Sequence, residues 1–149
     1  MTTSDNKTFF LDTNILVYAA DTTSPFHGAC KKLREQGMTG NISLCISPQV
    51  LFEFFAVITN SKRVTQPIKP QEAIKEMTKY LRAAHIIKIY PKSTVIEKTI
   101  ELCQKHNTKS QEIFDVQIVA TMLSNGITNI YTYDTSHFSR FEEIEVLTP

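Results

Sequence analysis

Three acidic residues stand in stretches of the sequence that are otherwise mostly apolar. Asp12 interrupts the apolar run of residues 9–17, and Glu53 is the only charged residue between positions 50 and 58. Asp115 begins a stripe of apolar residues at helical spacing. Burying one carboxylate costs on the order of several kcal/mol unless a cation or hydrogen-bond donors compensate. The simplest compensation that all three positions could share is a divalent metal ion.

A group of such carboxylates predicts metal-dependent chemistry. Clustered carboxylates repel one another and cannot all stay ionised without a cation. A set of oxygen ligands, with no Cys or His set beside it, favours one or two ions of Mg²⁺ or Mn²⁺ over zinc. Such a site typically acts on phosphate esters, because the ion polarises the phosphoryl group and lowers the pKa of a bound water.

The elements that must position these residues follow from the hydrophobic pattern. Short apolar runs alternate with longer helical patterns, which predicts a parallel sheet with helices on both faces. We therefore expect a single α/β domain over residues 1–149, a three-layer α/β/α sandwich, with residues 1–7 as a flexible N-terminus. The expected strands are 8–11, 43–46, 86–90, 128–133 and 144–147, and the expected helices are about 14–20, 25–36, 48–60, 70–84, 93–106 and 112–124. Gly37 is expected to cap the second of these helices.

The predicted elements bring the acidic residues to one edge of the sheet. Asp12 ends the first strand, Asp134 follows the fourth, and Glu53 lies within two turns of the start of the helix after the second. Ligands of such folds bind beyond the carboxyl ends of the strands, where the strand order reverses. We therefore expect these carboxylates and Asp115 to form one site.

Each acidic residue also has an ordinary structural explanation. Asp12 could cap the start of a helix, and Glu53 could be a solvated residue on a helix surface. Asp115 could favour the positive end of its helix dipole, and Asp134 could be a turn residue. These explanations stay open for each residue by itself, but their combination at one sheet edge favours a site.

Composition and charge set the limits of the prediction. The chain has 149 residues and a net charge of +1, so it fits one domain and has no global basic field of the kind that indicates nucleic-acid binding. The first residues lack a signal-peptide pattern, and no apolar stretch approaches the ~18 residues of a membrane span. Cys30, Cys45 and Cys103 are widely spaced, which predicts reduced thiols in a cytoplasmic protein.

Four segments of the sequence resemble the motifs of PIN-domain nucleases. Each contains one of the acidic residues, in the order in which the family's motifs occur. The segments are Phe-Phe-Leu-Asp-Thr-Asn-Ile-Leu-Val-Tyr at 9–18, Ser-Pro-Gln-Val-Leu-Phe-Glu-Phe-Phe-Ala-Val at 47–57, Ile-Phe-Asp-Val-Gln-Ile-Val-Ala-Thr at 113–121, and Tyr-Thr-Tyr-Asp-Thr-Ser-His-Phe-Ser-Arg-Phe at 131–141. One motif alone is weak, but the four in this order and spacing are specific and cover nearly the whole chain.

The resemblance implies a fold, an activity and partners. It implies a sheet of five parallel strands in the order 3-2-1-4-5, which places Asp12 and Asp134 on neighbouring strands. It implies that Asp12, Glu53, Asp115 and Asp134 are catalytic residues that hold Mg²⁺ or Mn²⁺, and that the protein cleaves single-stranded RNA. In size and motif style the chain is similar to VapC toxins of prokaryotic toxin–antitoxin pairs, which are homodimers inhibited by a VapB antitoxin.

One position departs from the family pattern. Many relatives have an Asp three residues after the acid of the fourth motif, where this chain has His137. If position 137 carries a metal ligand, His137 weakens the binding of a hard metal or changes the preferred metal. The ligand is expected at Asp134 instead, which leaves His137 in a peripheral, supporting position. Thr13 and Asn14 are expected to support Asp12 or a bound water. Lys62, Arg63 and Arg140 are candidates for contacts with substrate phosphates.

Other functions fit the sequence less well. The departure at His137 leaves open a degenerate PIN domain that binds RNA or protein without cutting it, and a PIN nuclease of RNA processing that is not a toxin. A receiver domain should have paired acids after its first strand, and a haloacid-type phosphatase should have Asp-x-Asp where this chain has Asn14. Only four glycines occur and none form a cluster, which excludes a glycine-rich phosphate loop.

Overall fold

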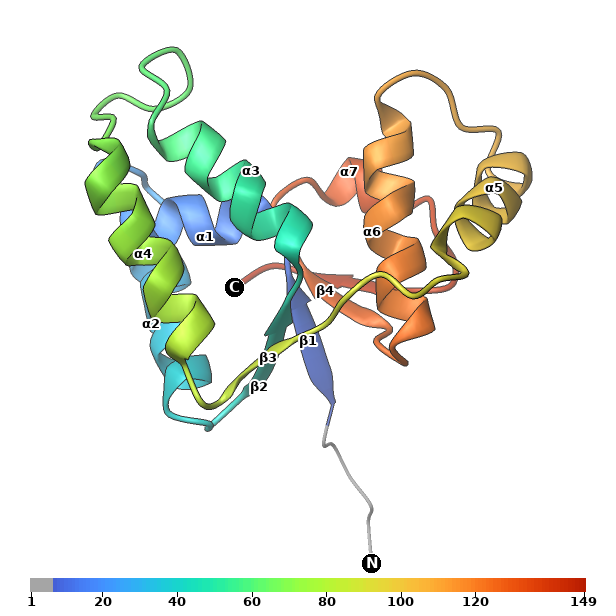
Figure 1. Cartoon of the computed structure of the whole chain (residues 1–149), viewed down its shortest axis with the longest axis horizontal. Helices are drawn as coiled ribbons and strands as arrows, with labels where there is room; N and C mark the ends of the chain where they lie inside the picture. The colour runs from blue at the N-terminus through green and yellow to red at the C-terminus, as the bar shows by residue number, and fades with distance from the viewer. Residues whose placement is uncertain (1–6) are drawn as a thin grey trace, which may run out of the picture.

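The computed structural model describes residues 7–149, in which five parallel strands form one sheet between two groups of helices (Figure 1). The strand order is β3-β2-β1-β4-β5, as the family resemblance implied. The expectation of a flexible N-terminus over residues 1–7 lies outside the described residues, apart from Lys7. The strands are β1 (Thr8–Leu11), β2 (Ser43–Ile46), β3 (Ile86–Lys88), β4 (Asn129–Tyr131) and β5 (Glu145–Leu147).

The helices form the two outer layers. Helices α1 to α4 lie on one side of the sheet, and α5 and α6 lie on the other (Figure 1). This arrangement follows from the strand order, because the chain moves outward from β1 to β3 and must then cross the sheet to reach β4. The helices are α1 (Thr13–Ala20), α2 (His27–Met38), α3 (Pro48–Ile58), α4 (Pro70–Arg82), α5 (Val95–Lys105), α6 (Glu112–Ser124) and α7 (Thr135–Phe138).

The central strand β1 explains why its sequence carries no alternating polar pattern. Both faces of the strand are covered by helices, so Phe10 and Leu11 are fully buried although they point to opposite faces. Phe10 pairs with Cys45 of β2 and Ile130 of β4, and all three are fully buried. The core on both sides of β1 therefore fixes the position of the residue that follows the strand.

The second helix corrects one sequence prediction. Gly37 was expected to cap this helix, but it lies inside α2, which continues to Met38. A side chain at position 37 would collide with Leu44 and Ile86, so glycine here allows the helix to approach the sheet closely. Gly40, with a φ of 82°, follows the helix end instead. Helix α7, a single turn, was not predicted from the sequence.

The edge of the sheet between β1 and β4 is where the strand order reverses. The last bond of this strand pair runs from the Asp12 backbone N–H to the Tyr131 carbonyl oxygen, at 3.1 Å. Asp12 and the residues after Tyr131 therefore leave the sheet side by side. No helix within residues 7–149 is long and apolar enough to cross a membrane.

Candidate active site

One pocket contains all four predicted acidic residues. It has a volume of about 340 Å³ and is lined by Asp12, Glu53, Asp115 and Asp134, together with Thr13 and Asn14. The four carboxylates come from the end of β1, the middle of α3, the first turn of α6 and the start of α7. Residues more than 100 positions apart in the chain thus meet at the sheet edge that the sequence predicted.

Asp12 is the most deeply buried of these carboxylates, at 5% exposed. Its Oδ1 accepts a hydrogen bond from the Thr13 backbone N–H at 2.8 Å, and its Oδ2 accepts one from the Thr132 hydroxyl at 2.7 Å. The expectation of a helix cap was therefore correct, since Asp12 caps α1. Burial nevertheless raises its pKa from 3.8 to about 6, and the charges of Asp134 and Asp115 add to the increase. The hydrogen bonds from the Thr13 N–H and the Thr132 hydroxyl lower this pKa, but they offset only part of the increase that burial causes.

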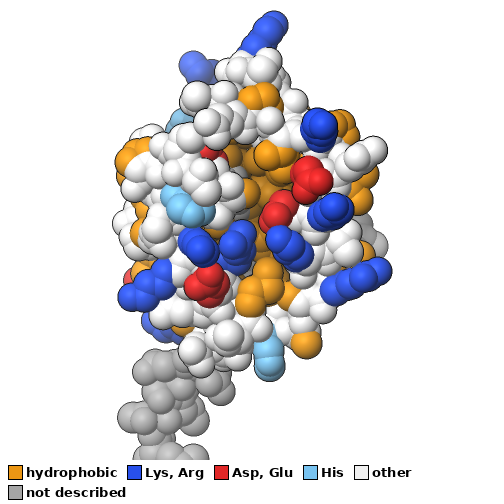
Figure 2. All heavy atoms as spheres, turned by 90° about the vertical axis from the view of Figure 1, so that its left-hand side faces the viewer, with side chains coloured by type: hydrophobic (Ala, Val, Ile, Leu, Met, Phe, Trp, Pro, Cys, Tyr) orange, Lys and Arg blue, Asp and Glu red, His pale blue; other side chains and the backbone are white. Residues whose placement is uncertain are grey.

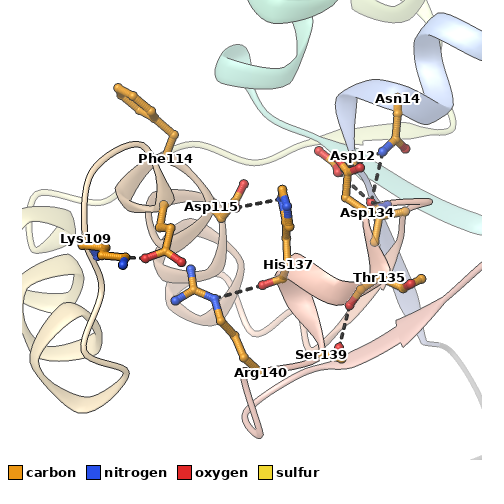
Figure 3. Close-up of polar contacts among 12 residues, drawn as sticks. Asp12, Asn14, Lys109, Phe114, Asp115, Asp134, Thr135, His137, Ser139 and Arg140 are labelled. Atoms are coloured by element: carbon orange, nitrogen blue, oxygen red, sulfur yellow. Dashed lines mark hydrogen bonds and ion pairs between the residues drawn. The ribbon is translucent and has the colours of Figure 1, made fainter.

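Thr132 connects the two neighbouring strand ends. While its hydroxyl donates to Asp12, its oxygen accepts from the Asp134 backbone N–H at 2.9 Å and from the Asn14 amide at 3.3 Å. Asn14 in turn accepts from the Tyr133 backbone N–H at 3.3 Å. These bonds hold the Asp12 carboxylate and the backbone of Asp134 in one fixed arrangement, with Asn14 beside them (Figure 3). Asn14 thus has the supporting position that was predicted for it.

Glu53 is held from both sides. Its Oε2 accepts from the Thr13 hydroxyl at 2.8 Å, and its Oε1 accepts from the Gln49 amide at 3.2 Å. Gln49 lies one helical turn before Glu53, and its amide also reaches the Phe114 carbonyl at 3.4 Å. The expectation of a solvated surface residue therefore does not hold for Glu53. Thr13 links this carboxylate to the helix that begins after Asp12.

Asp115 faces the pocket from α6 and lies beside a histidine side chain. The His137 Nδ1 lies 3.6 Å from its Oδ2, as Figure 3 shows. Burial raises the pKa of Asp115, His137 and Arg140 oppose that increase, and the charges of Asp134 and Glu53 add to it. His137 does not line the pocket of the four carboxylates, whereas Asp134 does. His137 is nonetheless closer to the site than the peripheral position expected for it, because it contacts Asp115.

A second pocket of about 660 Å³ adjoins the first, and Arg63, Lys109 and Arg140 line it together with the acidic Glu53, Glu112 and Asp115. Glu53, Asp115, Arg63 and Phe114 line both pockets. His137, Arg140 and Lys109 line the second one only. The Arg140 Nε donates to the His137 carbonyl at 3.0 Å, and its buried Nη2 has no hydrogen-bond partner among the described residues. Lys62, predicted beside Arg63, lines neither of these two pockets.

The donor chemistry of the first pocket fits a hard divalent cation. No group of three or more His, Cys, Asp or Glu side chains within residues 7–149 is arranged as a metal cage. Mg²⁺ does not require one, because it usually keeps several waters and binds through one or two carboxylates. The raised pKa of Asp12, which its neighbouring carboxylates increase further, is the feature that a cation would relieve.

Some residues of the site could not be identified from the sequence. Thr132 precedes an acidic residue by two positions, but nothing in the chain indicates that its hydroxyl reaches Asp12. Lys109 lies in the loop before α6, where Ser110 has a φ of 56°, and a charged loop is normally solvated. Gln49 had a detectable signal, since it lies four residues before Glu53 on the same helix face.

The substitution Asp12→Asn should stabilise the fold in the absence of divalent ions. Well below pH 3.8 the carboxyl is protonated in both folded and unfolded chains. As the pH rises to about 6 the unfolded chain releases its proton first, so stability falls by about 3 kcal/mol and stays low above that pH. Asparagine removes this loss but leaves the Thr132 hydroxyl proton without its acceptor, so we expect a net gain of about 1–2 kcal/mol at pH 7.

Urea unfolding of both proteins in chelator, from pH 4 to pH 8, measures this difference. The advantage of Asp12→Asn should grow between pH 4 and 6, and other titrating groups cancel because both proteins share them. A difference that does not change with pH would contradict the pKa assigned to Asp12.

Comparison with known proteins agrees with this geometry. Residues 9–144 match the family model of the PIN domain. The ribonucleases VapC48 and VapC24 of Mycobacterium tuberculosis are 23% and 24% identical to this chain, and each alignment covers 93% of this chain and 94% of the relative.

Solved structures show the same fold. VapC20 of Mycobacterium tuberculosis, a toxin that cleaves the Sarcin-Ricin loop, has a TM-score of 0.67 at 18% identity, covering 91% of this chain and 98% of that chain. VapBC2 from Rickettsia felis, bound to a DNA fragment from its promoter, has a TM-score of 0.66 at 19% identity, covering 95% of this chain and 98% of that chain. Because the family model spans nearly the whole sequence, the chain belongs to the PIN-domain family.

Proposed function

We propose that this protein is an endoribonuclease that uses Mg²⁺ or Mn²⁺ to hydrolyse phosphodiester bonds in single-stranded RNA. The observation that carries the proposal is the meeting of Asp12, Glu53, Asp115 and Asp134 in one pocket of a PIN domain. Two relatives that align with this chain over almost their full length are named ribonucleases. The proposed ligands of one or two ions are these four carboxylates.

The residues of the site have different roles in the proposed hydrolysis. A bound divalent ion supplies neutralisation of the phosphate charge and makes water more acidic. Thr132 and Thr13 fix the Asp12 and Glu53 carboxylates before substrate arrives, which reduces the reorganisation needed during reaction. Water attacks phosphorus in line, the bond from phosphorus to the leaving oxygen breaks, and that oxygen gains a proton. No covalent enzyme intermediate is needed.

The second pocket is the proposed path for the rest of the RNA backbone. Arg63, Arg140 and Lys109 line it, and it opens directly beside Asp115. Phosphates that flank the reacting one would meet these cations, which attract the backbone without reading its sequence.

Relatives also support a place in a toxin–antitoxin pair, so we propose that the protein is a VapC-type toxin held inactive by a VapB-type antitoxin in the cytoplasm. The comparison structures include VapBC complexes. The face on the side of α2 and α4 has a hollow with apolar side chains, bordered by Lys and Arg side chains (Figure 2). An exposed apolar patch with a polar rim is typical of a protein interaction site.

A homodimer is the proposed assembly. Helices α5 and α6 border an apolar groove of about 280 Å³, lined by Ile96, Ile100, Ile113 and Phe114 among others. Ile96 is 70% exposed and Phe114 is 55% exposed. Side chains of this size are seldom left in water as a group unless a partner covers them.

Purified protein should cleave unstructured RNA when Mg²⁺ or Mn²⁺ is present and should not cleave it in chelator. Asp115→Asn removes one proposed ligand charge, so the cleavage rate should fall by about a hundredfold or more. Glu101→Gln, an exposed change on α5, is the matched control and should cleave like the wild type. Gel analysis of labelled RNA, with all three proteins prepared identically, excludes a contaminating nuclease.

The same experiment separates the proposed enzyme from a degenerate PIN domain. The His137–Asp115 contact motivates this alternative, because a protonated imidazole could take the place of a cation next to Asp115. Absence of both cleavage and Mn²⁺ binding in the wild type would contradict the nuclease and leave a binding role.

Arg63→Gln should weaken RNA binding without altering base preference. Removing one phosphate contact should lower the slope of log affinity against log salt by about 0.7 for a single strand. Arg82→Gln, an exposed change on α4, is the control and should leave affinity and slope unchanged. Fluorescence anisotropy at several salt concentrations measures both quantities, and an unchanged slope in Arg63→Gln would place the backbone path elsewhere.

A further inference from the structure

Three aromatic side chains form a stacked group on the β4 side of the carboxylate pocket. The Phe26 ring lies 4.2 Å from the Tyr133 ring, centroid to centroid, at an interplanar angle of 28°. Tyr18 contacts both, at 5.3 Å from Phe26 and 5.6 Å from Tyr133. We call Tyr18, Phe26 and Tyr133 the aromatic group.

The aromatic group is joined to the catalytic residues. Tyr133 stands between Thr132, which donates to Asp12, and Asp134, and its backbone N–H donates to Asn14. Tyr18 lines the carboxylate pocket itself. RNA that enters the carboxylate pocket would therefore meet the aromatic group at Tyr18.

One ring of the group stays open to solvent. Phe26 is 40% exposed although it contacts both Tyr133 and Tyr18, so part of its surface stays open to solvent. The connection that carries Phe26 is held in place, since the Phe26 N–H donates to the Ser24 hydroxyl and the His27 ring bonds the Tyr18 carbonyl.

Phe114 also lines the carboxylate pocket, but its exposure is better explained by the proposed dimer contact. It is 55% exposed and lines the apolar groove between α5 and α6, where the proposed second copy would cover it. Phe26 does not line the groove between α5 and α6, so a second copy seated there does not explain its exposure.

We propose that the aromatic group is a stacking platform for an unpaired RNA base next to the phosphate that is cleaved. The proposal rests on the proposed nuclease function and adds a physical reason for its preference for single strands. A base held in a duplex is stacked on its neighbours and cannot lie on Phe26, whereas an unpaired base can. Stacking on an aromatic ring does not depend strongly on base identity, so the platform selects strandedness more than sequence.

Binding measurements with a matched pair of probes test the platform. The probes are a short adenosine oligoribonucleotide and an oligomer of equal length and charge that has the same backbone without bases. All variants carry Asp115→Asn to prevent cleavage, and affinities are measured in Mg²⁺ by fluorescence anisotropy. Phe26→Leu removes the ring but keeps an apolar side chain, Phe26→Tyr keeps the ring, and Tyr90→Leu is a control at an exposed aromatic residue away from the pocket.

Phe26→Leu should bind the adenosine probe about five- to tenfold more weakly and the base-free probe with unchanged affinity. Phe26→Tyr and Tyr90→Leu should bind both probes like the parent protein. An equal loss for both probes would overturn the proposal, because the ring would then act only by shaping the pocket. Unchanged affinity for both probes would also overturn the proposal, because Phe26 would then make no contact with the RNA.

The outcomes also separate this proposal from the nuclease itself. RNA cleavage by the wild type with base-independent binding would retain the nuclease and reject the platform. No binding of either probe by any variant would reject both. Thermal unfolding of each variant confirms that it is folded at the temperature of the measurement.

Discussion

The buried carboxylate of Asp12 is the constraint on which the rest of the site depends. It ends the central strand, at 5% exposed, where two hydrogen bonds compensate only part of the burial and its pKa is about 6. Asp134 and Asp115 lie close enough to raise that pKa further, so each added carboxylate makes the site less stable without a cation. In the function that we propose, the fold gives up stability here for a place where a cation would bind.

The parallel sheet delivers this arrangement through its order. Because β1 and β4 are adjacent, Asp12 and Thr132 follow neighbouring strand ends. The Thr132 hydroxyl can therefore donate to the Asp12 carboxylate and accept from the Asp134 backbone N–H. Helices α3 and α6 bring Glu53 and Asp115 from opposite layers to the same edge. The second pocket and the aromatic group lie beside the carboxylates, and we propose the pocket as a surface for phosphates and the aromatic group as a surface for a base.

The sequence predicted what depends on local pattern and motif order. Asp12, Glu53 and Asp115 were detectable because charges in apolar stretches need a reason. Asp134 was detectable because it follows the fourth strand within a family motif, and four motifs in order indicated the sheet topology. The position of Gly37 inside α2 was not predictable, since it depends on how closely Leu44 and Ile86 approach. Thr132 and Lys109 were missed because hydroxyl and ammonium groups are ordinary in loops, and only the tertiary structure shows what they face. The contact of His137 with Asp115 likewise depends on α7. This helix is a single turn, which is too short to leave a periodic pattern in the sequence.

The most direct test of this account is the pKa of the Asp12 carboxyl, measured by carbon-detected NMR titration of the wild-type protein with and without Mg²⁺. The account predicts titration near pH 6 in chelator, because burial and the neighbouring carboxylates disfavour the charge. It predicts a clearly lower midpoint with Mg²⁺, because the ion binds the ionised form. The same midpoint in both conditions would contradict a cation at this carboxylate, and an ordinary midpoint near 3.8 in chelator would contradict the electrostatic constraint itself.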